Sequence, residues 1–289
     1  MSGQNGARRF RFHQVDVFGA AALRGNPLAV VVDADDLADA DMAALANWTN
    51  LSETSFLLRP TRPGADYRVR IWTPTRELPF AGHPTLGSCQ VWLDAGGQPA
   101  GDTIVQECGV GLVPLRRGGG VLSFAAPPLI RSGPLDDAMR ARAAAAAGLQ
   151  PEDVVDAHWV DNGPGWLALL LRSRAAVLGA RPDLAGLGDL KVGLVGPWDA
   201  AVDGTDAQWE VRAFVSGYED PVTGSLNASV AQWLIDSGRA GPGYVASQGT
   251  ALGRAGRVRI SAAGDEIWVG GEVRTVIEGS LTLGQSNQP

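Results

Sequence analysis

Apolar and polar residues alternate along the first part of the chain, as they do in a half-buried strand. Residues 10–18 show this alternation, and the apolar run of residues 28–32 predicts a second, buried strand. The turn residues Arg24, Gly25, Asn26 and Pro27 separate the two runs. The chain is therefore expected to open with a β-hairpin.

Helical spacing of apolar residues recurs further along the chain, and turn or strand patterns fill the intervals. Helices are expected at 39–50, 84–93, 136–147 and 221–237. Strands are expected at 52–58, 67–73, 157–160, 166–171, 209–215, 244–247, 257–261, 266–269 and 274–278, with short strands broken by glycines over 103–124. Because this order is not a strict β-α-β alternation, it favours an α+β fold with mostly antiparallel sheets.

Two stretches of the sequence echo each other. Residues 69–72 (Val-Arg-Ile-Trp) lead to a Gly-His-Pro-Thr turn at 82–85, and residues 211–214 (Val-Arg-Ala-Phe) lead to Asp-Pro-Val-Thr-Gly-Ser at 220–225. Each copy predicts a strand, a turn and a helix start. A helix start presents unpaired N–H groups and the positive end of the helix dipole, so each copy could hold an anion such as a carboxylate.

The echo also predicts two similar halves. Consecutive prolines in Ala126-Pro127-Pro128 can continue neither a helix nor a sheet interior, which makes this tripeptide the candidate linker. The expected halves are 10–125 and 128–279. The last strand, near 280–286, is a candidate to return to the first half.

Composition describes an ordinary globular protein and excludes several partners. The chain has 289 residues, 45% of them hydrophobic, with a formal charge of -7, and its pI is near 5.0. Nucleic-acid binding needs a basic surface, so it is not expected. No apolar run reaches the length of a membrane span and no signal segment precedes the first strand, so a cytoplasmic protein is expected.

Metal and cofactor motifs do not occur in the sequence. The histidines at 13, 83 and 158 are scattered, and Cys89 and Cys108 form no cluster with them, so neither a metal nor a disulfide is expected. The single lysine, Lys191, is not in a Walker loop, and Gly186-Leu187-Gly188 is not a dinucleotide fingerprint. We expect no cofactor.

Three residues could carry acid–base chemistry, and each has a plainer explanation. His83 in its turn can titrate near neutrality, or it can simply hydrogen-bond a neighbouring carbonyl. Glu53 stands at the start of an apolar strand, where a carboxyl group can take part in proton transfer, or it faces solvent. Asp220 before Pro221 can bind a ligand, cap the helix, or do both.

Other polar residues near these turns have simpler interpretations. Turn geometry and surface solvation account for Asn26, Pro27 and Glu77, whereas Arg70 and Arg212 are expected to point outward or pair with acids. A cysteine nucleophile is disfavoured, because Cys89 lies six residues into the expected helix and would have to reach His83 from a different level of that helix.

Several blocks of the sequence together resemble the PhzF-like family, and they span residues from about 10 to 285. The blocks are Gly25-Asn26-Pro27-Leu28-Ala29-Val30, Ser52-Glu53-Thr54, Pro79-Phe80-Ala81-Gly82-His83-Pro84-Thr85-Leu86-Gly87, Glu219-Asp220-Pro221-Val222-Thr223-Gly224-Ser225, and Gln248-Gly249 through Gly253-Arg254. The resemblance implies the diaminopimelate epimerase-like fold, with two similar α/β halves. Each half has a curved sheet around a central helix, and the active site lies between them.

The resemblance also implies a function and a site. In the best-known member of this family the glutamate of the Ser-Glu-Thr block moves a proton between carbons, and the resemblance implies the same acid–base role for Glu53. The substrate-binding positions that match are Gly82, His83, Asp220, Gly224 and Ser225. The implied protein is a cofactor-independent isomerase of a small carboxylate-bearing metabolite, and a homodimer.

Two alternatives stay open at this point. Epimerases and racemases of this fold use two cysteines at the helix starts, and neither Cys89 nor Cys108 stands there, so an epimerase or racemase would have to work without thiols. A non-catalytic metabolite-binding protein on the same scaffold is the other alternative. The sequence does not name the substrate.

Overall fold

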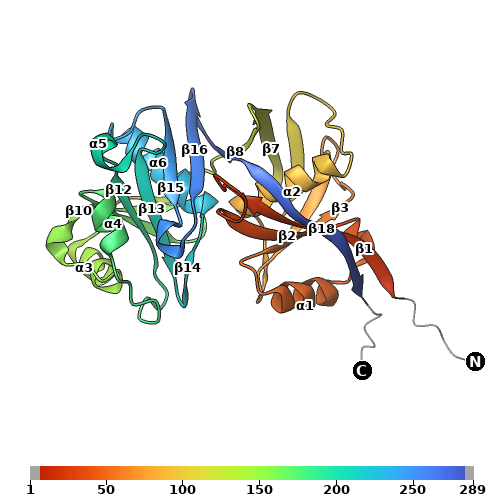
Figure 1. The fold of residues 1–289 in the computed structure, drawn as a ribbon, viewed down its shortest axis with the longest axis horizontal. Coiled ribbons are helices and arrows are strands. Elements are labelled where there is room, and N and C mark those ends of the chain that lie inside the picture. The colour runs from red at the N-terminus through yellow and green to blue at the C-terminus, as the bar shows by residue number, and fades with distance from the viewer. Residues whose placement is uncertain (1–6, 284–289) are drawn as a thin grey trace, which may run out of the picture. The chain divides into compact units, whose positions relative to one another are not determined.

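The computed structural model describes residues 7–283 of the chain, which form two compact units (Figure 1). Unit 1 comprises residues 7–17, 27–124 and 272–283, and unit 2 comprises residues 18–26 and 125–271. The sequence predicts two domains, at residues 10–125 and 128–279, and these domain boundaries remain a prediction. Residues 284–286 of the expected last strand lie outside the described residues.

Unit 1 is a mixed sheet with two longer helices. Its strands are β1 (Arg8–Val17), β2 (Asn26–Val32), β3 (Thr54–Leu58), β4 (Tyr67–Trp72), β5 (Glu77–Leu78), β6 (Ile104–Cys108), β7 (Gly111–Gly118), β8 (Val121–Ala125) and β18 (Val273–Leu283). Its helices are the 3₁₀ turn η1 (Ala34–Asp36), α1 (Asp39–Thr49) and α2 (Gly82–Asp94). The dark-blue β18 runs antiparallel beside the red β1, so the two ends of the described chain share one sheet (Figure 1).

Unit 2 has a similar content of strands and helices. Its strands are β9 (Arg131–Pro134), β10 (Val154–Asp161), β11 (Trp166–Leu171), β12 (Lys191–Pro197), β13 (Trp209–Val215), β14 (Tyr218–Asp220), β15 (Gly243–Gln248), β16 (Gly256–Ala263) and β17 (Glu266–Gly271). Its helices are α3 (Asp137–Ala146), η2 (Pro151–Asp153), α4 (Arg174–Gly179), α5 (Ala200–Asp203), α6 (Gly224–Asp236) and η3 (Thr250–Leu252).

The strand pairing of the two units follows the same pattern. In unit 1, β2 runs parallel to β3, β4 pairs antiparallel with β3 and β5, and parallel with β6. In unit 2, β11 runs parallel to β12, β13 pairs antiparallel with β12 and β14, and parallel with β15. Antiparallel hairpins β6–β7–β8 and β15–β16–β17 follow in each case. The similarity of the halves expected from the sequence is therefore confirmed.

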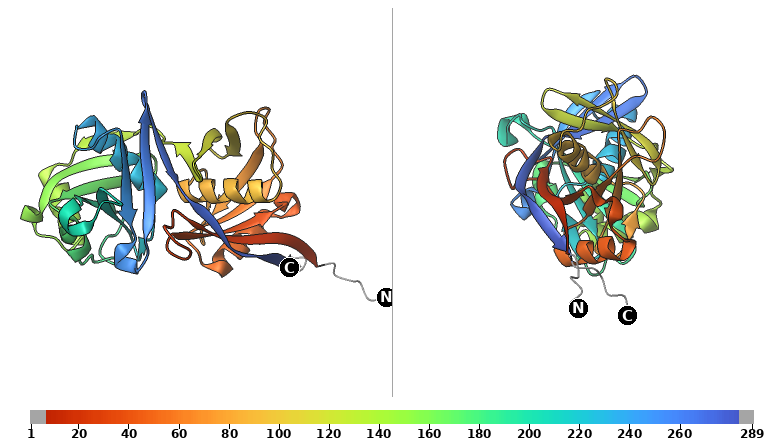
Figure 2. Two further views of the ribbon diagram at one scale, coloured as in Figure 1. Left: turned by 45° about the horizontal axis from the view of Figure 1, so that its top comes forward. Right: turned by 90° about the vertical axis from the view of Figure 1, so that its right-hand side faces the viewer.

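Each sheet packs against one almost fully buried helix, α2 in unit 1 and α6 in unit 2. Helix α2 contacts β1, β3, β4 and β18, and its gold ribbon lies along the red and orange strands in the left view of Figure 2. At Gly87 a Cβ atom would stand 2.5 Å from Leu28 Cδ2 and 3.0 Å from Val15 Cγ2. Only glycine allows the helix to approach the sheet this closely.

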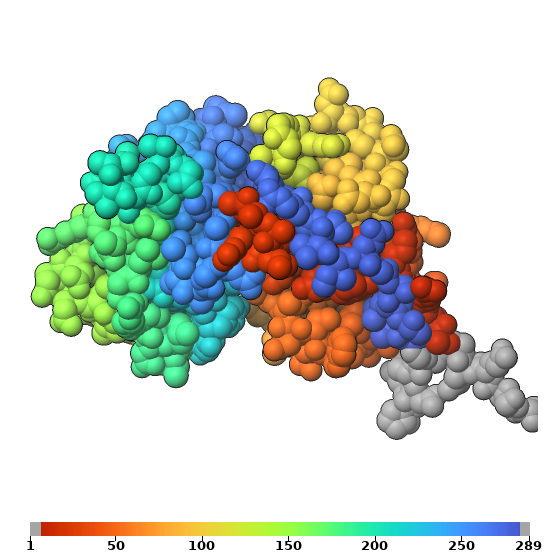
Figure 3. Space-filling view, in the orientation of Figure 1, coloured from red at the N-terminus to blue at the C-terminus, as the bar shows by residue number. Residues whose placement is uncertain are grey.

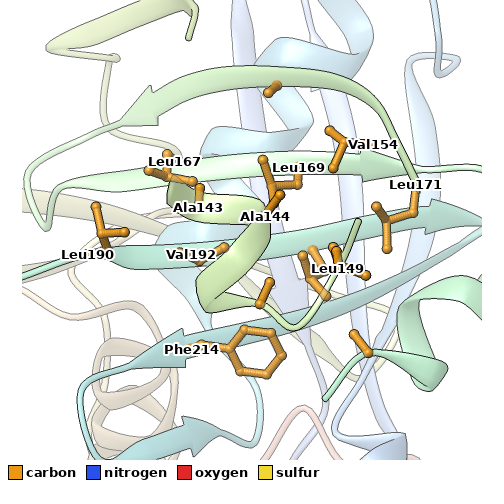
Figure 4. Packing of buried hydrophobic residues seen from close by; sticks show 14 of the residues in the cluster. Ala143, Ala144, Leu149, Val154, Leu167, Leu169, Leu171, Leu190, Val192 and Phe214 are labelled. Atoms are coloured by element: carbon orange, nitrogen blue, oxygen red, sulfur yellow. The ribbon is translucent and has the colours of Figure 1, made fainter. Parts of the chain in front are cut away.

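The opposite face of each sheet has its own apolar layer. In unit 2, Ala143 and Ala144 of α3 pack on leucines of β11 and on Phe214 (Figure 4). In unit 1, Met42 and Leu45 of α1 belong to a cluster with Phe56 of β3. Because both faces are covered, β11 is buried at every position, which explains its uninterrupted apolar sequence.

Most expected elements are present, with differences at the edges. Asn50 and Gly148 end their helices in the left-handed conformation, as their residue types predict. The expected helix 221–237 begins only at Gly224, because residues 218–220 pair with β13 as β14. The elements β9, β12, α4 and α5 were not predicted from the sequence. No helix among residues 7–283 is long and apolar enough to cross a membrane.

Candidate active site

The first group of candidate residues lies in unit 1, where Glu53 approaches His83. Glu53 stands directly before β3, and His83 is the second residue of α2. His83 Nε2 lies 3.4 Å from Glu53 Oε2, with side-chain exposures of 6% for the histidine and 15% for the glutamate. The structure thus brings together two residues that the sequence nominated separately.

The charge of His83 is set by its surroundings. Burial lowers the pKa of His83 to about 3, because the interior disfavours the charged imidazolium. The ring is therefore neutral near pH 7 and gives Glu53 no full opposite charge. A carboxyl group that is not locked in a salt bridge can exchange its proton with a substrate more readily.

Gly82 and His83 form the first turn of α2. Ala81 at the N-cap position makes no side-chain capping bond, so no side chain at that position occupies the amides of the first turn. Behind this turn, the Thr85 hydroxyl accepts a hydrogen bond from Gln106 Nε2 at 3.0 Å. Gln106 Oε1 in turn accepts from the Tyr67 hydroxyl at 3.1 Å, which ties the helix start to the sheet.

The second group lies in unit 2 around Asp220. Its Oδ1 accepts a hydrogen bond from Asn26 Nδ2 at 2.9 Å, and its Oδ2 accepts one from the Thr223 hydroxyl at 2.6 Å. Gln248 Nε2 donates to the backbone oxygen of Asp220 at 3.0 Å. Asn26 and Gln248 are both fully buried. Asp220 consequently accepts hydrogen bonds from three separate segments, two of them at its carboxyl group and one at its backbone oxygen.

Asp220 responds to burial in the opposite direction from His83. The pKa of Asp220 is raised to about 6, chiefly by burial and to a smaller extent by the charge of Glu219, while the hydrogen bonds from Thr223 and Asn26 oppose the rise. The expectation that Asp220 caps the following helix is wrong, because α6 begins at Gly224 with Thr223 as its N-cap residue. Instead, the Asp220 carboxyl group accepts a hydrogen bond from the side chain of that N-cap residue.

Gly224 and Ser225 form the first turn of α6, as Gly82 and His83 do in α2. The Ser225 hydroxyl accepts a hydrogen bond from Trp166 Nε1 at 2.9 Å, and its backbone oxygen accepts one from Asn162 Nδ2 at 3.1 Å. Since Trp166 can only donate, the Ser225 hydroxyl keeps its own proton available for another acceptor.

Two polar residues near the turns have different roles from those expected. Asn26 is not merely a turn residue, because it is fully buried and bonds to Asp220 and to the Val222 oxygen. Glu77 is not merely solvated, because it accepts two hydrogen bonds from Arg70, each of 2.7 Å. The expectation that the echoing arginines pair with acids is confirmed for both, since Arg70 pairs with Glu77 and Arg212 with Glu219.

Gln248 is a site residue that sequence reasoning did not nominate. It belongs to one of the family-like blocks, but an isolated glutamine at the end of a strand gives no chemical signal of its own. Its position opposite Val211 in the parallel pair of β15 with β13 brings it beside the start of α6. Only the fold reveals this role.

The two cysteines are unsuited to thiol catalysis. Both are buried, and burial raises the pKa of Cys89 to about 12 and also raises the pKa of Cys108. Neither thiol is poised to form the reactive thiolate. Among residues 7–283, no group of three or more His, Cys, Asp or Glu side chains is placed to hold a metal ion.

Solved structures place the fold in a known class. The phenazine biosynthesis PhzF family protein of Enterococcus faecalis superimposes with a TM-score of 0.78 at 24% identity, covering 96% of this chain and 100% of that one. A hydroxyproline epimerase from Agrobacterium vitis superimposes with a TM-score of 0.60 at 14% identity, covering 99% and 95%. The α+β fold is therefore that of the PhzF and epimerase-like proteins, as expected.

Sequence comparisons then identify the family. "Antisense-enhancing sequence 1" of Schizosaccharomyces pombe is 34% identical, covering 93% of this chain and 97% of that protein. Trans-2,3-dihydro-3-hydroxyanthranilate isomerase of Pseudomonas aeruginosa is 33% identical, covering 89% and 92%. The family model for phenazine biosynthesis-like proteins, PhzC-PhzF, matches residues 15–279. The chain belongs to this family, which includes named isomerases.

Proposed function

We propose that this protein is an isomerase that moves a proton within a small carboxylate-bearing metabolite, with Glu53 as the acid–base residue. Such a reaction breaks one C–H bond and forms another, so a single carboxyl group can accept the proton at one carbon and return it at the next. No electrons are exchanged with an outside partner. The proposed reaction therefore needs no cofactor.

The observation that carries the proposal is the distance of 3.4 Å between Glu53 Oε2 and His83 Nε2. The neutral imidazole can steer the carboxyl group by hydrogen bonding without neutralising it. His83 itself is a poor base at neutral pH, because burial keeps its pKa at about 3. Glu53 is the better candidate for carrying the proton.

The proposed substrate-binding residues are Gly82 and His83 in the first turn of α2, Gly224 and Ser225 in the first turn of α6, and Asp220 at the end of β14. First-turn amides and the helix dipole favour a carboxylate. The Asp220 carboxyl group favours a group that donates a hydrogen bond, such as an amine or a hydroxyl. Preorganised groups of this kind would orient a bound metabolite and stabilise charge as the proton leaves.

The decisive experiment measures proton exchange in deuterated water. Trans-2,3-dihydro-3-hydroxyanthranilate is the first compound to try, because a relative is named as its isomerase. Wild-type protein is expected to incorporate deuterium into the substrate or product, whereas Glu53→Gln should be slower by a factor of roughly 100 to 10,000. Glu152→Gln, on an exposed 3₁₀ turn, is the matched control and should leave the rate unchanged.

The outcomes separate the open alternatives. Equal exchange by wild type and Glu53→Gln would contradict the assignment of Glu53. Inversion of a chiral amino acid in chiral chromatography would indicate an epimerase, and binding without exchange would indicate a non-catalytic protein. The resemblance implies a homodimer, which light scattering on the purified protein tests, and cell fractionation tests the cytoplasmic location expected from the sequence.

A further inference from the structure

Backbone groups determine which atoms donate and which accept in the hydrogen bonds around Asp220. The Val222 backbone oxygen can only accept, so the Asn26 side-chain atom 2.9 Å from it is the amide nitrogen. The same nitrogen lies 2.9 Å from Asp220 Oδ1. Asn26 therefore donates to the carboxyl group and cannot accept from it.

A second chain of bonds reaches the other carboxyl oxygen. The Thr223 backbone N–H can only donate, so the Gln248 atom 3.0 Å from it is Oε1. Asn227 Nδ2 donates to the same oxygen at 2.7 Å and to the Thr223 backbone oxygen at 2.9 Å. This arrangement fixes the orientation of the Gln248 amide.

The fixed amide determines where the Thr223 hydroxyl proton points. Gln248 Nε2 donates to Thr223 Oγ1 at 3.0 Å, so the hydroxyl accepts on that side. Its only proton then lies on the line to Asp220 Oδ2, 2.6 Å away. Each oxygen of the carboxyl group thus accepts one hydrogen bond, from Asn26 Nδ2 or from the Thr223 hydroxyl. The other bonds of these two donors fix their orientation.

We propose that Asn26 and Gln248 are positioning residues that keep Asp220 a hydrogen-bond acceptor through both oxygens, so that Asp220 presents the substrate with a fixed negative group. This inference rests on the proposed function where it places Asp220 beside the substrate. Donors on both oxygens favour the ionised form. Asp220 would then accept a hydrogen bond from an amine or hydroxyl of the substrate.

The charged neighbours are consistent with this role. Glu219, adjacent in the chain, is the acidic group that acts on Asp220, and its own carboxylate is neutralised by Arg212 through bonds of 2.9 and 2.7 Å. Burial disfavours the ionised form of Asp220, and the hydrogen bonds from Asn26 and Thr223 favour it. Removing one of these donors should therefore raise the pKa of Asp220.

The test is a ¹³C NMR titration of protein with labelled aspartate carboxyl groups, in which the Asp220→Asn variant identifies the Asp220 signal. The wild-type signal is expected to titrate near pH 6. In Gln248→Leu the Thr223 hydroxyl is free to turn away, so the midpoint should rise by about one pH unit, a tenfold change in the ionisation constant. Asn26→Ser removes the other donor and should raise it similarly.

Gln232→Leu is the matched control, since it removes a half-buried glutamine of the same unit that donates to Pro127. Its midpoint should equal that of wild type. An unchanged midpoint in folded Gln248→Leu, or in folded Asn26→Ser if the first variant does not fold, overturns the proposal.

With active protein, the acidic limb of the pH–rate profile should move with the midpoint. Absence of activity in wild type would contradict the proposed function and leave the titration decisive for the network.

Discussion

The Arg212 guanidinium holds the Glu219 carboxylate through two hydrogen bonds, from Nε at 2.9 Å and from Nη2 at 2.7 Å. Unit 1 contains the same arrangement in Arg70 and Glu77, with both bonds at 2.7 Å. In each unit the pair joins the strand of the echoing sequence to the short strand that leads to the central helix. Because the two ion pairs differ in solvent exposure, their contributions to stability can be compared.

Replacing the arginine should cost far more stability in unit 2 than in unit 1. Exposure of the Arg212 and Glu219 side chains is 6% and 7%, whereas Arg70 and Glu77 are 17% and 38% exposed. Arg212→Met leaves a buried, unpaired carboxylate and should lower the free energy of unfolding by about 3–5 kcal/mol. Arg70→Met should lower it by about 1 kcal/mol or less. Urea denaturation measures both, and equal losses would contradict this account.

His83 should make stability depend on pH in the acidic range. Its pKa is about 3 in the folded protein and ordinarily 6.5, so the unfolded chain binds more protons between these values. Wild type should therefore lose stability as the pH falls from 6.5 toward 3, with a contribution from this group approaching 1.4 kcal/mol per pH unit.

The measurement compares wild type with His83→Gln in urea denaturation at several pH values. Other groups titrate in both proteins, so the difference between the two curves isolates His83. The difference in free energy of unfolding should shrink at low pH. Only wild type must release the proton of His83 on folding there, and this destabilises its folded state. A difference that is constant from pH 7 to pH 4 would show that His83 is not held neutral by burial.

Gly256 should not tolerate a larger residue. A Cβ atom there would stand 2.5 Å from Val222 Cγ2 and 2.8 Å from the Gln248 backbone oxygen. Gly256→Ala should lower the free energy of unfolding by about 1–3 kcal/mol and disturb the setting of Asp220. Gly243→Ala in the same hairpin is the control, because its nearest atom would be an ordinary 3.6 Å away. Thermal unfolding and the Asp220 titration should both separate the two variants.

The thiols should be inert in the folded protein. Burial raises the pKa of Cys89 to about 12, and Cys89 is fully buried. Iodoacetamide at pH 8 should leave native protein unmodified and fully active, whereas protein in denaturant should gain two adducts by mass spectrometry. Rapid alkylation with loss of activity would reopen the thiol-dependent racemase alternative.

Local patterns predicted the elements of the fold because they act over short distances. The alternation of residues 10–18, the caps at Asn50 and Gly148, and the turn before α2 are each determined by a few neighbouring residues. The family-like blocks nominated Glu53 and His83 separately. Their distance of 3.4 Å follows only from how β3 packs on α2.

Partnerships between distant segments could not be predicted in the same way. Asn26 looks like a turn residue in sequence, yet its side-chain amide donates to Asp220, which lies 194 positions further along the chain. The Ala20 amide bonds to the Ala255 oxygen at 3.0 Å, which holds residues 18–26 against this part of unit 2, and the red and blue surfaces meet there in Figure 3. No local periodicity encodes that contact.

The return of β18 to β1 has a consequence for synthesis. A chain made from its N-terminus has all of unit 2 once residue 271 is in place, whereas the sheet of unit 1 still lacks residues 273–283. Until then, β1 exposes a row of unpaired N–H and C=O groups that other chains could bind. Residues 8–17 must therefore wait for residues 273–283 before the sheet of their unit is complete.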